Sequence, residues 1–72
     1  MTRTAEDARR DPQPGDVLRR GNRRIQVISR CYLRNFGECV EYQVRRNKYT
    51  GTMTLEHFIE WAAEAEVLEV AE

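Results

Sequence analysis

The sequence predicts one small α+β domain, a bent antiparallel sheet of four or five strands followed by one helix near the C-terminus. Three observations support this class. Seventy-two residues allow a single domain with a thin core. Apolar and polar residues alternate within 16–46, which is typical of strands, and apolar residues recur at helical spacing over 55–65. We therefore expect a flexible tail over 1–14 and a folded domain over 15–72.

The N-terminal segment has no sustained apolar period. It ends in residues 11–15 (DPQPG), which cannot continue a helix because proline lacks an N–H donor and restricts the residue before it. A flexible tail with at most a transient helical turn over 4–10 is the expectation that follows.

The first strands flank a turn. Residues 16–20 and 24–29 stand on either side of Gly21-Asn22, and both turn residues tolerate positive φ, so this stretch predicts a tight hairpin. The following segment, 30–38, is open between an extension of the strand and a loop with a second turn.

The clearest strand covers 39–46. One face carries Val40, Tyr42 and Val44, and the other carries Glu41, Gln43 and Arg45. Residues 47–51 have the composition of a turn, and 52–53 can form a short strand after it.

Thr54 is the predicted N-cap of a helix over 55–65. Its apolar stripe consists of Leu55, Phe58, Ile59 and Ala62. We expect the helix to end near residue 65, because Glu64 and Glu66 oppose the helix dipole there. For 67–70 a short closing strand is preferred over a helix extension.

The predicted core is small. Its members are Val17, Ile25, Val27, Val40, Tyr42, Val44, Leu55, Phe58, Ile59, Ala62 and Leu68. So few apolar residues predict modest stability unless the chain forms a homodimer, which would bury more apolar area.

The net charge of zero conceals an uneven distribution. Residues 1–49 hold all twelve basic residues and six acids, a net charge of +6. Residues 50–72 hold six glutamates and no Lys or Arg, a net charge of −6. Eleven of the twelve basic residues are arginine, whose planar guanidinium suits contact surfaces. Charge complementarity is therefore a feature that any binding hypothesis must use.

The composition argues against several function classes. No apolar run approaches the roughly 18–20 residues of a membrane span, and the N-terminus lacks the apolar core of a secretory signal. We therefore expect a cytoplasmic protein with no membrane partner. Cys31 and Cys39 match no metal or redox spacing and are expected to be free thiols. His57 has no motif nucleophile beside it, so we expect no catalytic residue, no metal, no cofactor and no enzyme.

The helix carries the first candidate binding surface. Glu56, Glu60 and Glu64 recur every four residues as an acidic stripe, and Trp61 lies part of a turn away from the apolar stripe. This face suits docking onto a basic protein surface, with Trp61 as an exposed anchor. The alternatives are a solvated helix face and a Trp61 at the edge of the core.

Arginine pairs form the second candidate surface. It consists of Arg19, Arg20, Arg23, Arg24, Arg45, Arg46 and Tyr49. With Tyr32 and Phe36 interleaved, such a surface suits phosphate pairing and base stacking, which predicts contact with nucleic acid. The alternatives are arginines that protect exposed sheet edges or that pair with the acidic segment within the fold.

Four short stretches resemble small prophage- and plasmid-encoded proteins of unknown function. These are Pro14-Gly15-Asp16-Val17, Arg24-Ile25-Gln26-Val27, Val40-Glu41-Tyr42 and Thr54-Leu55-Glu56-His57-Phe58, within residues 14–61. The resemblance implies an SH3-like, partly open β-barrel with an appended helix, and it supplies no catalytic residue. It also implies an accessory or inhibitory role on a bacterial protein complex. We therefore expect a non-enzymatic module that binds a bacterial or phage protein, with nucleic-acid binding through the Arg-rich hairpin and sheet face as the alternative.

Overall fold

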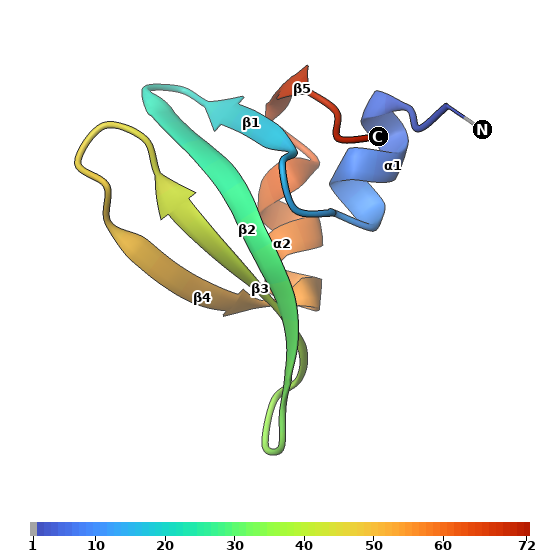
Figure 1. The fold of residues 1–72 in the computed structure, drawn as a ribbon, viewed down its shortest axis with the longest axis vertical. Coiled ribbons are helices and arrows are strands. Elements are labelled where there is room, and N and C mark those ends of the chain that lie inside the picture. Colours follow the sequence, from blue (N-terminus) through green and yellow to red (C-terminus); the bar gives the residue numbers. More distant parts are fainter. Residues whose placement is uncertain (1) are drawn as a thin grey trace.

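The computed structural model describes residues 2–72; Met1, the first residue of the expected tail, lies outside the described residues. One open, five-stranded antiparallel sheet has the order β4-β3-β2-β1-β5 and is accompanied by two short helices (Figure 1). The elements are α1 (Ala5–Arg10), β1 (Val17–Arg20), β2 (Arg23–Leu33), β3 (Gly37–Val44), β4 (Thr50–Thr54), α2 (Leu55–Ala62) and β5 (Glu66–Glu69). The α+β class and the antiparallel sheet are confirmed, whereas the expectation of a single helix is wrong.

The additional helix, α1, lies in the segment expected to be flexible. A capping box begins it, in which Asp7 N donates to Thr4 Oγ1 (3.1 Å) and Thr4 N donates to Asp7 Oδ2 (2.9 Å). The helix packs against α2 and β5, Ala8 is fully buried, and Arg9 Nη2 donates to Ala65 O at 3.0 Å. Six residues are too few to show an apolar period, so these tertiary contacts, and not the local sequence pattern, hold the segment on the domain.

The Gly21-Asn22 hairpin is confirmed. Arg20 and Arg23 are register partners on either side of the turn, and Gly21 has a φ of 63°, a conformation that glycine adopts without strain. The turn therefore fixes the register of β1 against β2 along its whole length.

The segment 30–38, left open by the sequence, is strand, turn and strand. β2 continues to Leu33, Phe36 N donates to Leu33 O at 3.0 Å, and β3 begins at Gly37. Gly37 has a φ of 80°, so a glycine suits this closing position. Earlier in β2, the register with β3 shifts between Val27 and Ser29. This shift leaves Ile28 as an extra residue that bends the strand.

The core lies between one face of the sheet and α2. The predicted core residues that are buried are Val17, Ile25, Val27, Val40, Tyr42, Val44, Phe58 and Ala62. Ile59 is 37% exposed, so its place in the predicted core is wrong, and Leu55 and Leu68 are only half-buried. The structure adds Leu18 and Ala65 to the core cluster. Phe58 and Ala62 are the buried residues of α2, and this orientation leaves Ile59 at the rim.

α2 ends at Ala62, earlier than the predicted end near residue 65. Glu64 N donates to Trp61 O at 3.4 Å and Ala65 N donates to Ala62 O at 3.0 Å, so the chain leaves the helix through tighter turns. This reversal brings β5 beside β1 and confirms the predicted closing strand, which starts at Glu66.

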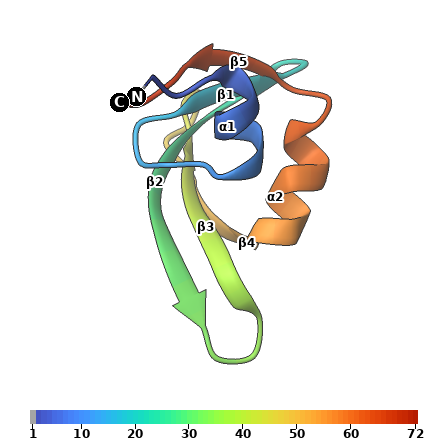
Figure 2. The same ribbon diagram turned by 90° about the vertical axis from the view of Figure 1, so that its right-hand side faces the viewer.

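Asp16 is a buried carboxylate that connects three segments of the chain. Arg3 Nη1 and Nη2 donate to Oδ1 and Oδ2 at 2.7 and 2.8 Å, Gln13 N donates to Oδ2 at 2.8 Å, and Ala71 N donates to Oδ1 at 2.7 Å. Burial alone raises the pKa of Asp16, but the Arg3 guanidinium and the two backbone donors outweigh it, so this pKa lies below its usual value. We call these four residues the Asp16 clamp; they hold the N-terminal segment beside the C-terminal one (Figure 2).

Candidate interaction surfaces

Ion pairs connect the basic and acidic parts of the chain. Arg19 on β1 pairs with Glu66 on β5, and Arg20 Nη2 lies 2.7 Å from Glu64 Oε2. Pairing within the fold is therefore confirmed for these two arginines. Arg19, Arg20 and Glu64 form ion pairs with other residues of the same chain. Both candidate binding surfaces are therefore smaller than the sequence predicted.

The arginines on β1 and β2 do not protect the edges of the sheet. The edge strands are β4 and β5, while β1 and β2 each have a neighbouring strand on both sides. Edge protection is therefore the wrong interpretation of Arg19, which has register partners on both sides, Arg24 on β2 and Glu66 on β5.

Trp61 lies at the edge of the core. Its side chain is half-buried and packs against the core cluster, and its ring centroid is 6.3 Å from that of Phe58. A tilted aromatic pair of this kind stabilises the fold. Of the two interpretations left open for Trp61, the edge of the core is confirmed; its role in binding stays a prediction.

Exposed apolar side chains gather instead on the β2–β3 hairpin. Tyr32, Leu33 and Phe36 are 74%, 42% and 67% exposed. The pairing of β3 with β4 ends at Cys39, so the hairpin beyond that residue consists of two strands only. Figures 1 and 2 show it projecting past the rest of the molecule. We call residues 32–38 the hairpin arm.

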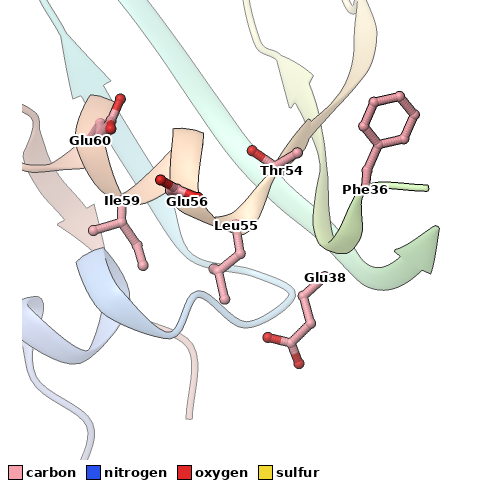
Figure 3. Close-up of a pocket in the computed structure, with 7 residues that line it drawn as sticks. All are labelled: Phe36, Glu38, Thr54, Leu55, Glu56, Ile59 and Glu60. Carbon is pink, nitrogen blue, oxygen red and sulfur yellow. The ribbon is translucent and has the colours of Figure 1, made fainter. Parts of the chain in front are cut away.

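A groove of about 480 Å³ lies between the hairpin arm and α2. Its lining comprises Phe36, Glu38, Thr54, Leu55, Glu56, Ile59 and Glu60. Figure 3 shows Leu55 and Ile59 projecting from the same side of α2; Phe36 comes from the arm, and its ring points away from these two side chains in this view. The groove therefore combines apolar side chains from two separate elements. We call it the acidic groove, because three of its residues are glutamates.

Two of the three carboxylates of the acidic groove, those of Glu56 and Glu60, are available for binding. Among residues 2–72, neither Glu56 nor Glu60 forms an ion pair with a basic side chain. Glu38 Oε2 lies 3.4 Å from Arg30 Nη2, and Arg30 lies closer, at 2.7 Å, to Asp11 Oδ1. The structure thus keeps Glu56 and Glu60 in a candidate protein-binding surface, and it assigns Glu64 to an internal pair.

Sequence reasoning missed the apolar part of this surface. Tyr32 and Phe36 were grouped with the arginines as stacking residues for nucleic acid, but they lie on the hairpin arm, at the opposite end of the sheet from the Arg-rich turns. The sequence did contain a signal for it. Three large apolar residues, Tyr32, Leu33 and Phe36, lie beside a turn and outside the alternating pattern that predicts the buried face of the sheet.

Of the predicted Arg-rich surface, the four arginines without a glutamate partner among residues 2–72 lie where the β1–β2 turn meets the β3–β4 turn. Arg23, Arg46 and Tyr49 line one depression of about 380 Å³ at this end. Arg45 N donates to Arg24 O at 2.9 Å, which places the neighbouring arginine pairs side by side. We call this region the basic end; its residues are Arg23, Arg24, Arg45, Arg46, Lys48 and Tyr49.

Other reactive side chains form no additional site. Cys31 and Cys39 are register partners with free thiols, and the pKa of Cys31 is raised by burial and then by neighbouring Cys39 and Glu41. His57 is exposed; its backbone N donates to Thr54 Oγ1 at 3.1 Å, which confirms Thr54 as the N-cap. Within residues 2–72 no three His, Cys, Asp or Glu side chains cluster as a metal site would require, and neither helix is long and apolar enough to cross a membrane.

No protein-family model, curated protein or solved structure matches the chain.

Proposed function

We propose that this chain is a non-enzymatic protein-binding module that uses the hairpin arm and the acidic groove. We further propose that it is a phage or mobile-element protein that acts in the bacterial cytoplasm, as an accessory to or inhibitor of a bacterial protein complex. The observation that carries the proposal is the exposure of three large apolar side chains on the arm, Tyr32, Leu33 and Phe36.

Exposed apolar groups on a projecting hairpin are costly in water. Each square ångström of apolar surface that a partner covers contributes about 25 cal/mol. Single exposed apolar residues are ordinary, whereas a projecting hairpin with three large ones is typical of a protein interface. Tyr32 and Leu33, as neighbours on β2, present apolar surface on opposite faces of the hairpin. Phe36 and Ile59, which are 67% and 37% exposed, border the same groove, so one partner can cover both.

The charges of the acidic groove define the chemistry of the partner. Glu56 and Glu60 rim a groove whose apolar lining includes Leu55 and Phe36. A complementary segment would insert an apolar side chain between Leu55 and Phe36 and place Lys or Arg beside the two carboxylates. Such charge pairs mainly raise the association rate and set the orientation, while the buried apolar anchor provides most of the affinity.

We propose an SH3-like, partly open barrel as the finer description of the fold. Two features support it. Strands β1 to β4 form a meander, and β5 returns beside β1. The extra residue Ile28 bends β2, which allows one long strand to serve both halves of a curved sheet. In this description α2 is the appended helix that fills the opening of the barrel between β4 and β5.

An affinity capture tests the proposed function. The wild-type chain and three variants, Phe36→Ser, the double variant Glu56→Lys/Glu60→Lys, and Tyr49→Ser, are immobilised and exposed to lysate of a bacterial host, and the retained protein is then purified for titration. We expect Phe36→Ser to weaken binding by about 2 kcal/mol, roughly 30-fold, because it removes the anchor. The charge reversal is expected to slow association.

Tyr49→Ser is the matched control. It also removes a well-exposed aromatic ring, which is 57% exposed, but from the opposite end of the sheet, so it should leave the affinity unchanged. An unchanged affinity for Phe36→Ser, or a loss of the same protein by Tyr49→Ser, would contradict the proposed function.

A further inference from the structure

We propose that the basic end binds single-stranded nucleic acid, with Arg23 and Arg46 on phosphates and Tyr49 stacked on a base. The depression that these three side chains line, together with Arg20, Asn22, Val44 and Asn47, shares no residue with the acidic groove. Binding at the basic end can therefore be tested separately from protein binding at the hairpin arm.

The sheet register brings the two turns of the basic end together. Ile25 and Val44 are register partners, and Arg45 N donates to Arg24 O at 2.9 Å, so the residues just before Ile25 lie beside those just after Val44. Val44 N also donates to Tyr49 O at 2.7 Å, which folds the second turn back onto the strand. As a result, Arg23 from one turn and Tyr49 from the other border the same depression.

The cations at this end are not neutralised within the fold. Among residues 2–72, Arg23, Arg24, Arg46 and Lys48 form no ion pair with a carboxylate. The side-chain contact of Arg45 is with a neutral amide, at 3.1 Å from its Nη1 to Gln26 Oε1. Arg19 and Arg20, by contrast, have Glu66 and Glu64 as partners. The formal charge of zero therefore does not describe the basic end, which presents five cations without acidic partners.

Strand alternation distributes these cations around the end of the sheet. Ile25 faces the core, so Arg23, two residues before it on β2, lies on the same face of the sheet. Arg46 is in the turn after β3 and lines the same depression as Arg23. Arg24 lies on the opposite face of β2, together with Gln26, whose Oε1 accepts a hydrogen bond from Arg45. A strand of nucleic acid crossing this end would therefore meet guanidinium groups on both sides of the sheet, as a backbone-tracking surface requires.

Tyr49 is held in place while much of its ring remains accessible. Tyr49 N donates to Asn47 Oδ1 at 3.0 Å and the ring lies against Gly51, where an added Cβ would come within 3.1 Å of Cε2. The side chain is nevertheless 57% exposed. An ordered, accessible ring beside guanidinium groups suits stacking on an unpaired base. A duplex hides its base faces and an acidic peptide has none, so single-stranded nucleic acid uses more of this surface than either does.

Fluorescence anisotropy with labelled single strands of about 12 nucleotides, one RNA and one DNA, tests the proposal. Titrations at about 50 and 200 mM salt should differ about sevenfold in affinity if two phosphates are contacted, since the salt slope is about −0.7 per phosphate for single strands. Arg23→Gln/Arg46→Gln should remove most of that salt dependence. Tyr49→Ser should weaken binding by about tenfold at both salt concentrations, while Tyr49→Phe should retain it.

Two matched controls lie on the hairpin arm. Arg34→Gln removes an exposed arginine and Tyr32→Ser removes an exposed tyrosine, so neither should change the affinity for the oligonucleotide. The proposal is overturned by the absence of binding at about 50 mM salt. It is equally overturned if Arg34→Gln weakens binding as much as the double variant does. The same holds if either a duplex or an acidic peptide displaces the labelled strand as well as an unlabelled single strand does. The RNA and DNA titrations show which of the two strands the basic end prefers.

Discussion

The Asp16 clamp and the hairpin arm use their side chains in opposite ways. At the clamp, a carboxylate with no exposed surface accepts hydrogen bonds from Arg3, Gln13 and Ala71, so every strong charge has a partner inside the molecule. On the hairpin arm, Phe36 and Tyr32 are mostly exposed, on a hairpin with no third strand beside it. The first region stabilises the fold, and the second presents groups that the fold does not need.

This difference separates structural from functional use of the same residue types. Arg3 and Arg23 are both arginines, but Arg3 completes a buried ion pair and Arg23 has no acidic partner among residues 2–72. Substitutions at the clamp should therefore change stability, whereas substitutions on the hairpin arm or at the basic end should change binding alone.

The largest effect is expected from Asp16→Asn. It removes the negative charge that faces Arg3 and should lower the free energy of unfolding by about 3 kcal/mol. For a domain of this size the midpoint of thermal unfolding should then fall by roughly 12–24 °C. Circular dichroism during heating measures this, with Glu69→Gln, an exposed carboxylate on β5, as the control. A loss below about 1 kcal/mol would show that the clamp does not hold the fold.

Titration of the same carboxylate should reveal the second effect. The pKa of Asp16 is lower in the folded chain than in the unfolded one, so its ionisation stabilises the fold above about pH 4. This contribution should be lost as the pH falls through the folded-state pKa. Denaturant unfolding between about pH 6 and 3 measures the change. Asp16→Asn should lack this component; an identical pH dependence in the variant would contradict the assignment.

Exposed ion pairs should matter less than the clamp. In the Arg20–Glu64 pair, the two side chains are 43% and 72% exposed. Arg20→Gln should therefore lower the free energy of unfolding by at most about 1 kcal/mol, and by less at high salt. Chemical denaturation at low and high salt checks the value. A cost equal to that of Asp16→Asn would remove the distinction between buried and exposed charges.

The smallest effect on stability is expected on the hairpin arm. The double variant Tyr32→Ser/Phe36→Ser should unfold within about 0.5 kcal/mol of the wild type, because both rings are exposed. The same denaturation experiment measures it. A destabilisation above about 1 kcal/mol would mean that the arm packs on the domain in solution, and its apolar groups would then need no partner.

The sequence predicted the elements whose pattern is local. The Gly21-Asn22 turn, the alternation of Val40 and Tyr42, and the Thr54 cap each depend on neighbouring residues, and each is confirmed. Helix α1 was predicted only as a transient turn over 4–10, because the contacts with α2 and β5 that hold it are not visible in the local pattern. These contacts are remote in sequence.

The candidate site was predicted only in part for the same reason. Glu56 and Glu60 remain in it, because their spacing alone places both of them on the solvent side of α2. The pairing of Glu64 with Arg20 and the position of Phe36 and Leu55 on one groove depend on how distant segments pack, so no local pattern contains them.

The most direct test of the central claim is to locate where a protein partner contacts the chain. A photo-crosslinking phenylalanine analogue is placed at Phe36 on the hairpin arm or, as the matched position, at Tyr49 on the basic end. After irradiation in lysate of the bacterial host, the crosslinked protein is identified by mass spectrometry. We expect one protein to be captured from position 36 and not from position 49. Capture of that protein from position 49 and not from position 36 would contradict the account.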